Sequence, residues 1–347
     1  MTFVSVLLPV YNGTRYLERA AGSILQQTHR DLELIVLDDG STDGSGAMAE
    51  ALGDSRVRVI RSERNQGLAT TLNRGLREAR GSIVARQDAD DLSHPRRLEK
   101  QVAFLESNPD IGLLGSQAWL MDERGHCFGV LEHACGHESL VWELSFDNAF
   151  VHSSVAFRRD AALTGCGGYD ESWAYNQDYD LWLRLAPRTR LANLPERLVA
   201  LRSHRASMTQ TMGAESATAN RLLLARSLSS VLGEMPADAV ELVARAREGM
   251  DVSDLRRLLP LLENWVGSYR AFLTSESQAD FRRTVARQYL QLAFTRRGRT
   301  ARRIILALWA ARHFGGELTR EFLGLATIRS RLLLGYEPLA SFQANAL

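Results

Sequence analysis

The sequence predicts an α/β fold in which helices cover both faces of a mainly parallel sheet, followed by an all-α C-terminal domain. In the first part of the chain, short apolar runs rich in Val, Ile and Leu alternate with amphipathic stretches of helical spacing. Such alternation is typical of a parallel sheet. After about Ser203 the strand-like runs stop, and Leu, Ala and Arg recur at helical spacing, as in "ESATANRLLLARSLSSVL".

The first elements are marked by their turn residues. "FVSVLLPV" predicts a strand that ends before Asn12-Gly13, and "RYLERAAGSILQQ" predicts the helix that follows it. "LELIVLDDG", "GSGAMAEAL" and "VRVI" then predict a strand, a short helix and a third strand.

The alternation continues with the helix "GLATTLNRGLREA" and a fourth strand, "GSIVARQDADD". "HPRRLEKQVAFLES" predicts a helix with Pro95 in its first turn, and "IGLLGSQAWLM" predicts another strand. We expect an α/β domain over residues 1–205 and a helical domain over residues 206–347.

The composition limits the class of protein. With 45% apolar and 24% charged residues, the chain has the composition of a soluble globular protein. A net charge of +1 gives no general attraction to nucleic acid. Three cysteines cannot form a disulfide framework and suit a reducing compartment. The N-terminus lacks a basic region and "IILALWAA" is too short to span a bilayer, so we expect a cytoplasmic protein.

Polar residues gather where the predicted parallel strands end, which is where ligands bind in such sheets. Tyr11 there can stack on a flat base or pack as a rim aromatic residue. Asp38 and Asp39, in "VLDDGSTDGS", can accept hydrogen bonds from a base or a ribose, or can simply form a turn.

The stretch "ARQDADD" places Asp88, Asp90 and Asp91 within four positions. Like charges at this spacing repel one another unless a positive group lies between them. Mg²⁺ and Mn²⁺ prefer oxygen ligands and often bind between carboxylates and substrate phosphates. The alternatives are a solvated turn, which is the usual role of such a motif on its own, and a cation site, which the apolar strand before the motif supports.

Two later stretches carry further candidates. In "NQDYDLWLRL", Asp178 and Asp180 start a helix, either as favourable charges at its N-terminus or with Asp178 as a general base. In "LRSHRAS", Arg202 and His204 belong either to a polar loop or to a phosphate or metal contact. The Cys and His residues of "CFGVLEHACGHE" match no common zinc spacing.

Taken in order, seven stretches of the first 205 residues resemble the inverting family 2 glycosyltransferases, which have the Rossmann-like GT-A fold. They are "VSVLLPVYNG", "SILQQTHRDLELIVLDDGSTDGS", "NQGLATTLNRG", "ARQDADD", "HSSVAFRR", "DYDLWLRL" and "RSHRAS". The predicted C-terminal helices lie outside this resemblance.

The resemblance implies a nucleotide-sugar site and assigns residues to it. Pro9 and Tyr11 would line the base pocket, and Asp39 would meet the base or ribose. The donor pocket would also include Asn65, Asn73 and Arg86.

The resemblance assigns the remaining residues to the metal, the diphosphate and the acceptor. Asp88 would reach the ribose or the metal, and Asp90 would hold Mn²⁺ or Mg²⁺ on the diphosphate. His204 would lie near the diphosphate or metal. His152 and Ser153 would lie on the acceptor side, and Asp178 would be the catalytic base.

The implied reaction moves a sugar from a nucleoside diphosphate sugar to a hydroxyl of a glycan or lipid-linked acceptor, in surface polysaccharide biosynthesis. UDP-sugar is the default donor, and dTDP- and GDP-sugars stay open. Family members often have Glu-Asp at the base motif, whereas this chain has Gln177-Asp178. The base aspartate is kept, so we expect the chemistry to survive and the contacts to substrate hydroxyls to differ.

Three other functions are weaker matches. A nucleotidyltransferase usually has a Gly-rich loop after the first strand, and "VYNGTRYL" has one glycine. A glycoside hydrolase would use two carboxylates but would not explain a nucleotide pocket. A non-catalytic binding or scaffold protein would not need Asp88, Asp90 and Asp178 together.

The stretch "FTRRGRTARRIILALWAARHF" places five arginines beside an amphipathic run. They are Arg296, Arg297, Arg299, Arg302 and Arg303. Either this is a packed helix with a solvated basic face, or it lies on anionic lipid where a lipid-linked acceptor would be.

Overall fold

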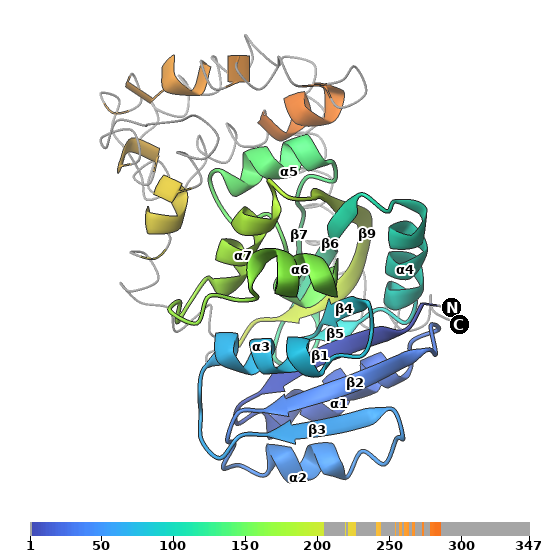
Figure 1. Cartoon of the computed structure of the whole chain (residues 1–347). Helices are drawn as coiled ribbons and strands as arrows, with labels where there is room; N and C mark the ends of the chain where they lie inside the picture. Colours follow the sequence, from blue (N-terminus) through green and yellow to red (C-terminus); the bar gives the residue numbers. More distant parts are fainter. Residues whose placement is uncertain are drawn as a thin grey trace. The chain divides into compact units, whose positions relative to one another are not determined.

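The chain forms two compact units (Figure 1). The computed structural model describes residues 2–204 and, beyond them, residues 219, 221–226, 241–243, 254, 257–258, 260–263, 266–267, 273 and 278–285. Of these, residues 2–133 and 150–204 belong to the first unit, and residues 134–149 group with the C-terminal residues in the second.

One sheet of nine strands organises the first unit. The strands are β1 (Val4–Val10), β2 (Leu32–Asp38), β3 (Val57–Arg61), β4 (Ile83–Arg86), β5 (Leu92–Ser93), β6 (Ile111–Met121), β7 (Cys127–Leu131), β8 (Ala156–Arg158) and β9 (Arg190–Arg202). Their order is β3-β2-β1-β4-β8-β6-β9-β5, with β7 paired to β6. Strands β3, β2, β1 and β4 are parallel, as are β6 and β9, whereas β8 is antiparallel to both of its neighbours. The predicted α/β class is confirmed.

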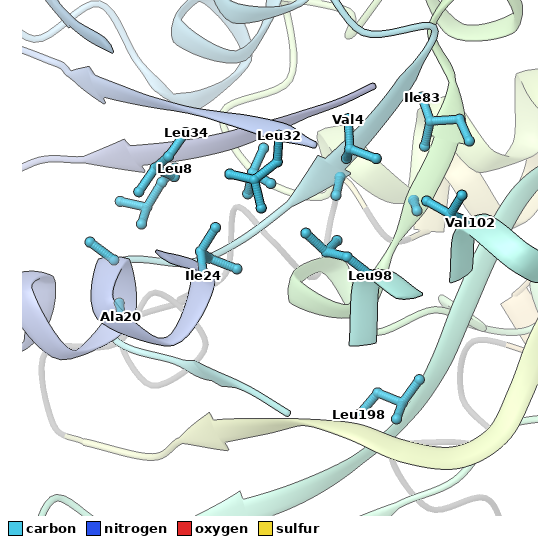
Figure 2. Packing of buried hydrophobic residues seen from close by; sticks show 14 of the residues in the cluster. Val4, Leu8, Ala20, Ile24, Leu32, Leu34, Ile83, Leu98, Val102 and Leu198 are labelled. Carbon is cyan, nitrogen blue, oxygen red and sulfur yellow. The ribbon is translucent and has the colours of Figure 1, made fainter. Parts of the chain in front are cut away.

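Helices cover both faces of the parallel part of the sheet. The helices of the first unit are α1 (Thr14–Leu25), α2 (Ser45–Glu50), α3 (Leu68–Glu78), α4 (Arg97–Ser107), α6 (Arg159–Cys166) and α7 (Gln177–Leu185), with a 3₁₀ turn, η1, at His152–Ser154. Helix α5 (His137–Leu144) belongs to the second unit. Apolar residues of α1, α2 and α4 pack in one buried cluster with alternate residues of β1, β2 and β4 (Figure 2).

Helix α3 covers the opposite face. Leu7 lies between Val6 and Leu8 in β1, and only the latter two belong to the cluster of Figure 2. Gly75 of α3 approaches Leu7 and Leu37 so closely that a Cβ atom there would lie 2.6 Å from Cδ1 of Leu37. The absence of a side chain on Gly75 therefore sets how near α3 lies to the sheet.

The carboxyl ends of the parallel strands meet at one edge of the sheet. Val10, at the end of β1, is paired with Asp38, and Leu7 is paired with Arg86. The predicted fourth strand is shorter than expected, because β4 ends at Arg86 and the acidic residues that follow form a turn. The Gln87 side chain donates to the Asp88 and Asp91 carbonyls, at 3.2 and 2.9 Å, and so closes this turn.

The second unit has few described residues. Helix α5 contributes Trp142, whose ring lies 5.5 Å from that of Phe281, and the Gly136 N–H donates to the Asp280 carboxylate at 3.3 Å. The predicted domain boundary after residue 205 stays a prediction, since most of residues 206–347 lies outside the described residues. Within the described part, no helix is long and apolar enough to span a membrane.

Candidate active site

The loops after β1 and β2 are joined by hydrogen bonds. Asn12 has a left-handed backbone (φ 54°), donates its N–H to the Ser41 hydroxyl at 2.9 Å and accepts from the Thr42 N–H at 2.8 Å. Tyr11, before this turn, is 52% exposed, while Pro9 is buried in β1. Tyr11 is thus an accessible aromatic ring beside a hydrogen-bonded pair of loops, and its place in a base pocket stays a prediction.

Asp43 caps two helices that begin at these loops. Its Oδ2 accepts from the Thr14 N–H and its Oδ1 from the Ser45 N–H, both at 3.0 Å. These are the first residues of α1 and α2, whose free N–H groups carry partial positive charge. Slight burial raises the pKa of Asp43, but the hydrogen bond from the Ser45 hydroxyl, together with these N–H bonds, outweighs it and lowers the pKa to about 2.

Asp39 holds the neighbouring loop. Its two carboxylate oxygens accept from the N–H groups of Gln66, at 2.9 Å, and Gly67, at 3.0 Å. The side chain of Asn65 also accepts from the Gly67 N–H, at 3.1 Å. The structure therefore brings Asp39 and Asn65 together, while their contact with a base or ribose stays a prediction. Asp38 is buried and serves the turn itself.

The three acids of "ARQDADD" have different environments. The side chains of Asp88 and Asp90 are 35% and 28% exposed, whereas Asp91 is only 3% exposed. Asp88 Oδ1 accepts from Arg86 Nη2 at 2.6 Å, and Asp90 Oδ2 lies 2.9 Å from His204 Nε2. Only Asp88 and Asp90 can therefore reach a ligand, and each is paired with a cationic or ionisable residue predicted from the sequence.

Ser153 lies between Asp88 and Asp91. Its Oγ is 2.5 Å from Asp88 Oδ2 and 2.6 Å from Asp91 Oδ2, and it also accepts from the Asp88 N–H at 3.0 Å. One hydroxyl proton cannot serve two carboxylates, so one of the acids is protonated. Burial, followed by the charges of Asp90 and Asp88, raises the pKa of Asp91 well above its usual value, so the proton belongs to Asp91.

The pKa values of Asp88 and Asp90 are shifted in opposite directions. Burial raises the pKa of Asp88, but Arg86 and His152 outweigh it and hold that pKa below its usual value. Burial and the nearby Asp88 charge raise the pKa of Asp90. The hydrogen bond and charge of His204 oppose this increase only in part. A cation between the two carboxylates would remove the repulsion that raises the pKa of Asp90.

Arg97, which the sequence pattern did not single out, lies buried beneath the turn. Its N–H groups donate to Gln101 Oε1 (3.1 Å), Gln87 Oε1 (3.0 Å), Ser93 Oγ (2.7 Å), the Arg86 carbonyl (2.6 Å) and the Val155 carbonyl (3.2 Å). Burial, followed by the charge of Arg86, lowers the pKa of Arg97 to about 9. The guanidinium is thus charged at neutral pH, and it holds the strand end and the turn together.

Arg202 supports the same turn from the other side. Its Nε donates to the Asp90 carbonyl at 2.9 Å, and its Nη1 donates to the carbonyls of Asp122 and Glu123 at 3.2 and 3.1 Å. The guanidinium also lies 4.5 Å from the centre of the Tyr16 ring. Of the two functions open for Arg202, these contacts favour the structural one.

The two acids of "NQDYDLW", both in the first turn of helix α7, have different environments. Asn176, with φ 60°, precedes the helix. Asp180 is fully buried and forms an ion pair with Arg184 at 2.6 Å, one turn away. Asp178 is partly exposed, so it alone can meet a substrate. Gln177 is buried, and its Oε1 has no hydrogen-bond partner among the described residues.

His152 connects Asp178 to the acidic turn. Burial, followed by the charge of Arg86, lowers the pKa of His152 to about 4, and the carboxylates of Asp178 and Asp88 oppose that shift. Both carboxylates therefore act on one imidazole, which is neutral at pH 7. Its Nε2 lies 3.2 Å from the Tyr169 hydroxyl. The His152 ring also lies 6.1 Å from that of Trp182 in α7, and Ser153 beside it contacts Asp88. A shared substrate site for Asp178 and Asp88 stays a prediction.

Asn73 contacts this site through the segment that carries Tyr169. Its Nδ2 donates to the Tyr169 carbonyl at 2.8 Å and to Glu171 Oε1 at 2.9 Å, and its Oδ1 accepts from the Tyr169 N–H at 2.8 Å. Its amide is thus occupied in holding residues 169–171. A direct contact of Asn73 with a donor stays a prediction.

Comparison with known proteins assigns the family. The profile of "Glycosyl transferase family 2" matches residues 5–163. The chain is 34% identical over 218 residues to the O-antigen biosynthesis glycosyltransferase WbnJ of Escherichia coli, a match that covers 60% of this chain and 82% of WbnJ. The chain belongs to the family 2 glycosyltransferases. This family is inverting, so the sequence resemblance is confirmed.

A further relative agrees with this family, and a solved structure agrees with the fold. The amylovoran biosynthesis glycosyltransferase AmsE of Erwinia amylovora is 33% identical over 204 residues, covering 57% of this chain and 76% of AmsE. The structure of S. aureus TarS residues 1–349 in complex with UDP-GlcNAc superposes with a TM-score of 0.55 at 16% identity, covering 96% and 92% of the two chains. The GT-A fold of this glycosyltransferase is thereby confirmed.

The donor set of this family 2 enzyme fits a hard divalent cation held jointly with a substrate. Among the residues that the structure describes, no group of three or more His, Cys, Asp or Glu side chains is arranged to hold a metal ion. Mg²⁺ and Mn²⁺ sites in phosphate-transferring proteins commonly use one or two carboxylates and complete their shell with phosphate oxygens and water. The accessible carboxylates of Asp88 and Asp90 match that arrangement.

Proposed function

We propose that this glycosyltransferase transfers a sugar from a UDP-sugar to a hydroxyl of a glycan or lipid-linked acceptor in surface polysaccharide biosynthesis. The names of WbnJ and AmsE, an O-antigen and an amylovoran enzyme, support the pathway class. The UDP-GlcNAc complex of TarS makes UDP-sugars the first donors to test. Other nucleoside diphosphate sugars are the alternatives within the same reaction.

One observation carries the proposal. Ser153 bonds to the donor-side acid Asp88, and the ring of its neighbour His152 lies 6.1 Å from that of Trp182 in α7, the helix that carries Asp178 in its first turn. A diphosphate at Asp88 and an acceptor hydroxyl at Asp178 would therefore share a single site. Inversion needs the acceptor oxygen to attack from the face opposite the leaving diphosphate. Two carboxylates at two parts of one site suit such a single displacement.

Asp178 is the proposed catalytic base. Its carboxylate would accept the proton of the attacking hydroxyl as the new glycosidic bond forms and the bond to the diphosphate breaks. An ordinary carboxylate has a pKa near 4 and is a weak base for an alcohol. Proton removal is therefore expected late in the transition state, with the positioning of the hydroxyl contributing much of the rate.

Asp88 and Asp90 are the proposed ligands of Mn²⁺ or Mg²⁺. When bound, such an ion neutralises the negative charge that develops on the leaving diphosphate. His204, which bonds to Asp90, would orient that carboxylate or contact the diphosphate. Asp88 would also reach the ribose, as the family resemblance implies.

The nucleoside is proposed to lie at the hydrogen-bonded loops after β1 and β2. Tyr11 is the exposed ring on which a base can stack, with Pro9 behind it in the sheet. Asp39 and Asn65 lie in the adjoining loop pair and are proposed to contact the base or ribose. Arg86 and Asn73 complete the set on the sugar side.

Calorimetry tests the donor. UDP, dTDP and GDP should be titrated into the full chain with Mn²⁺ and with a chelator. We expect UDP to bind most tightly, with an affinity that rises when Mn²⁺ is present. If no nucleoside diphosphate binds under either condition, the enzyme function is wrong and a scaffold role on the same fold is favoured.

Asp178→Asn tests the base. We expect the variant to bind UDP within about threefold of wild type but to lose about 10²–10⁴-fold in kcat, because only proton acceptance is removed. Asp160→Asn, an exposed carboxylate on α6, is the matched control and should keep wild-type turnover. Retained turnover in Asp178→Asn would remove Asp178 from the base role.

We further propose peripheral membrane contact through the arginine-rich stretch of residues 296–303, which lies outside the described residues. Its five arginines would attract anionic headgroups at about 1 kcal/mol each near the surface. Flotation with phosphatidylglycerol vesicles should recover the protein, and flotation with phosphatidylcholine vesicles should not. Equal recovery from both would contradict the proposal.

A further inference from the structure

The 3₁₀ turn η1 connects the two parts of the site. Its first residue, His152, contacts the Tyr169 hydroxyl, and its second, Ser153, contacts the acidic turn. The hydroxyl of its third residue, Ser154, bonds only to backbone groups: it donates to the Val151 carbonyl at 2.8 Å and accepts from the Ser116 N–H at 3.0 Å. Three consecutive residues thus serve three different purposes.

Ser153 holds Asp88 at two points. Its hydroxyl oxygen accepts from the Asp88 N–H at 3.0 Å and lies 2.5 Å from Asp88 Oδ2, to which it donates. The second contact, with Asp91 Oδ2, anchors the hydroxyl to a buried residue of the turn. Ser153 is fully buried, so water cannot replace these contacts.

The carboxylate of Asp88 is thereby held on both oxygens. Arg86 Nη2 donates to Oδ1 at 2.6 Å, and Ser153 donates to Oδ2. Both donors are buried, while 35% of the Asp88 side chain remains accessible. A ligand-binding group fixed in this way loses little conformational freedom when the ligand binds.

We propose that Ser153 is a positioning residue that orients the Asp88 carboxylate for the nucleotide donor. The family resemblance places Ser153 on the acceptor side, whereas its hydroxyl here contacts the donor-side acid. The inference rests on the proposed function, because it assigns Ser153 a part in donor binding. Ser153 acts through Asp88 and makes no contact of its own with the donor.

Ser153→Ala tests this inference, with Ser154→Ala as the matched control. The control removes a hydroxyl of equal burial, from the same turn, that bonds only to backbone. Calorimetry with UDP and Mn²⁺ should show about tenfold weaker binding for Ser153→Ala, the effect of one charge-assisted hydrogen bond, and less than about threefold for the control. Ser153→Thr keeps the hydroxyl and should restore most of the affinity. Circular dichroism checks that each variant is folded.

A double-mutant cycle separates positioning from general structural damage. In an Asp88→Asn background the Ser153 hydroxyl has no carboxylate to orient, so adding Ser153→Ala should weaken UDP binding by less than about threefold. An equal loss in both backgrounds, or wild-type affinity in Ser153→Ala, would overturn the inference while leaving the proposed function intact. If wild type itself binds no nucleoside diphosphate, the proposed function fails, and the inference fails with it.

Discussion

At the residue scale, Ser153 has a single hydroxyl proton, yet two carboxylate oxygens lie within 2.6 Å of its oxygen. The arrangement is satisfied when Asp91 is a neutral acid that donates to Ser153, which in turn donates to Asp88. The Asp91 Oδ1 atom accepts from the Arg202 N–H at 2.8 Å, so every polar atom of this buried carboxyl has a partner. Asp91 therefore behaves as a structural group rather than a ligand.

Asp91→Asn should preserve this arrangement. The amide oxygen can accept from the Arg202 N–H and the amide NH₂ can donate to Ser153, as the neutral acid does. We expect a loss of about 1 kcal/mol or less in the free energy of unfolding, measured by urea denaturation. Asp91→Ala should cost about 2–3 kcal/mol, because it leaves buried groups without partners. Equal losses in the two variants would contradict the neutral-acid assignment.

His152 makes stability depend on pH. Its pKa falls from 6.5 to about 4 on folding, through burial and then Arg86, with Asp178 and Asp88 opposing. Between these values the unfolded chain binds a proton that the folded chain does not, so this contribution is complete above pH 6.5 and is lost as the pH falls. From pH 7 to pH 5, wild type should lose about 2 kcal/mol more than His152→Gln in urea denaturation.

The matched control for this measurement is His126→Gln, because His126 has a 70% exposed side chain in a surface turn. It should lose as much stability as wild type between the two pH values. The assignment to His152 would be wrong if His126→Gln and His152→Gln had the same pH dependence.

At the element scale, helices α1 and α2 begin without a side-chain cap from the residues that precede them, Gly13 and Gly44. One carboxylate, Asp43, serves both, with one oxygen on each first N–H group. Because these helices start at the carboxyl ends of β1 and β2, the cap also ties together the loops proposed to hold the nucleoside. Local stability and ligand position are therefore coupled at this point.

Asp43→Ala should destabilise both helix starts. Loss of an N-cap costs about 1–2 kcal/mol, and we expect a decrease of that size in the free energy of unfolding, with weaker UDP binding. Asp54→Ala is the control, since Asp54 is a partly exposed carboxylate that bonds Arg56 and caps no helix. It should cost less than about 1 kcal/mol and leave UDP affinity unchanged. Similar UDP affinities in the two variants would show that capping by Asp43 does not affect the nucleoside site.

At the scale of the whole molecule, each compact unit has its own buried aromatic cluster. In the first, Trp182 is fully buried beside Phe150 and Phe157. In the second, Trp142 is buried beside Phe146 and Phe281. Units with separate cores can unfold in separate transitions.

Two tryptophan variants should distinguish the units in a calorimetric scan. UDP should raise the temperature of one unfolding transition, and we expect Trp182→Ala to lower the temperature of that transition. Trp142→Ala should lower the temperature of the other transition. Each shift should correspond to a loss of about 3–5 kcal/mol in the free energy of unfolding. A single transition that both substitutions lower equally would show that the chain unfolds as one cooperative body.

The amino-acid sequence alone determined the local elements of the first part of the chain. Periods of two and 3.6 residues, with Gly, Asn and Pro at the turns, predicted the elements that became β1 to β4, α1 to α4 and β6. It also determined that Asp39, Asp88 and Asp178 lie at strand ends or a helix start. These are properties of neighbouring residues, so a linear pattern records them.

The tertiary structure alone decided which side chains meet. The strand β8 inserts antiparallel between β4 and β6, and the turn before it brings Ser153 to Asp88 across 65 positions of sequence. The burial of Arg97 and the different exposure and partners of the three acids of "ARQDADD" depend on the same long-range pairing. Hydrogen bonds and desolvation act over a few ångströms of space, and no periodicity along the chain encodes which distant residues come within that range.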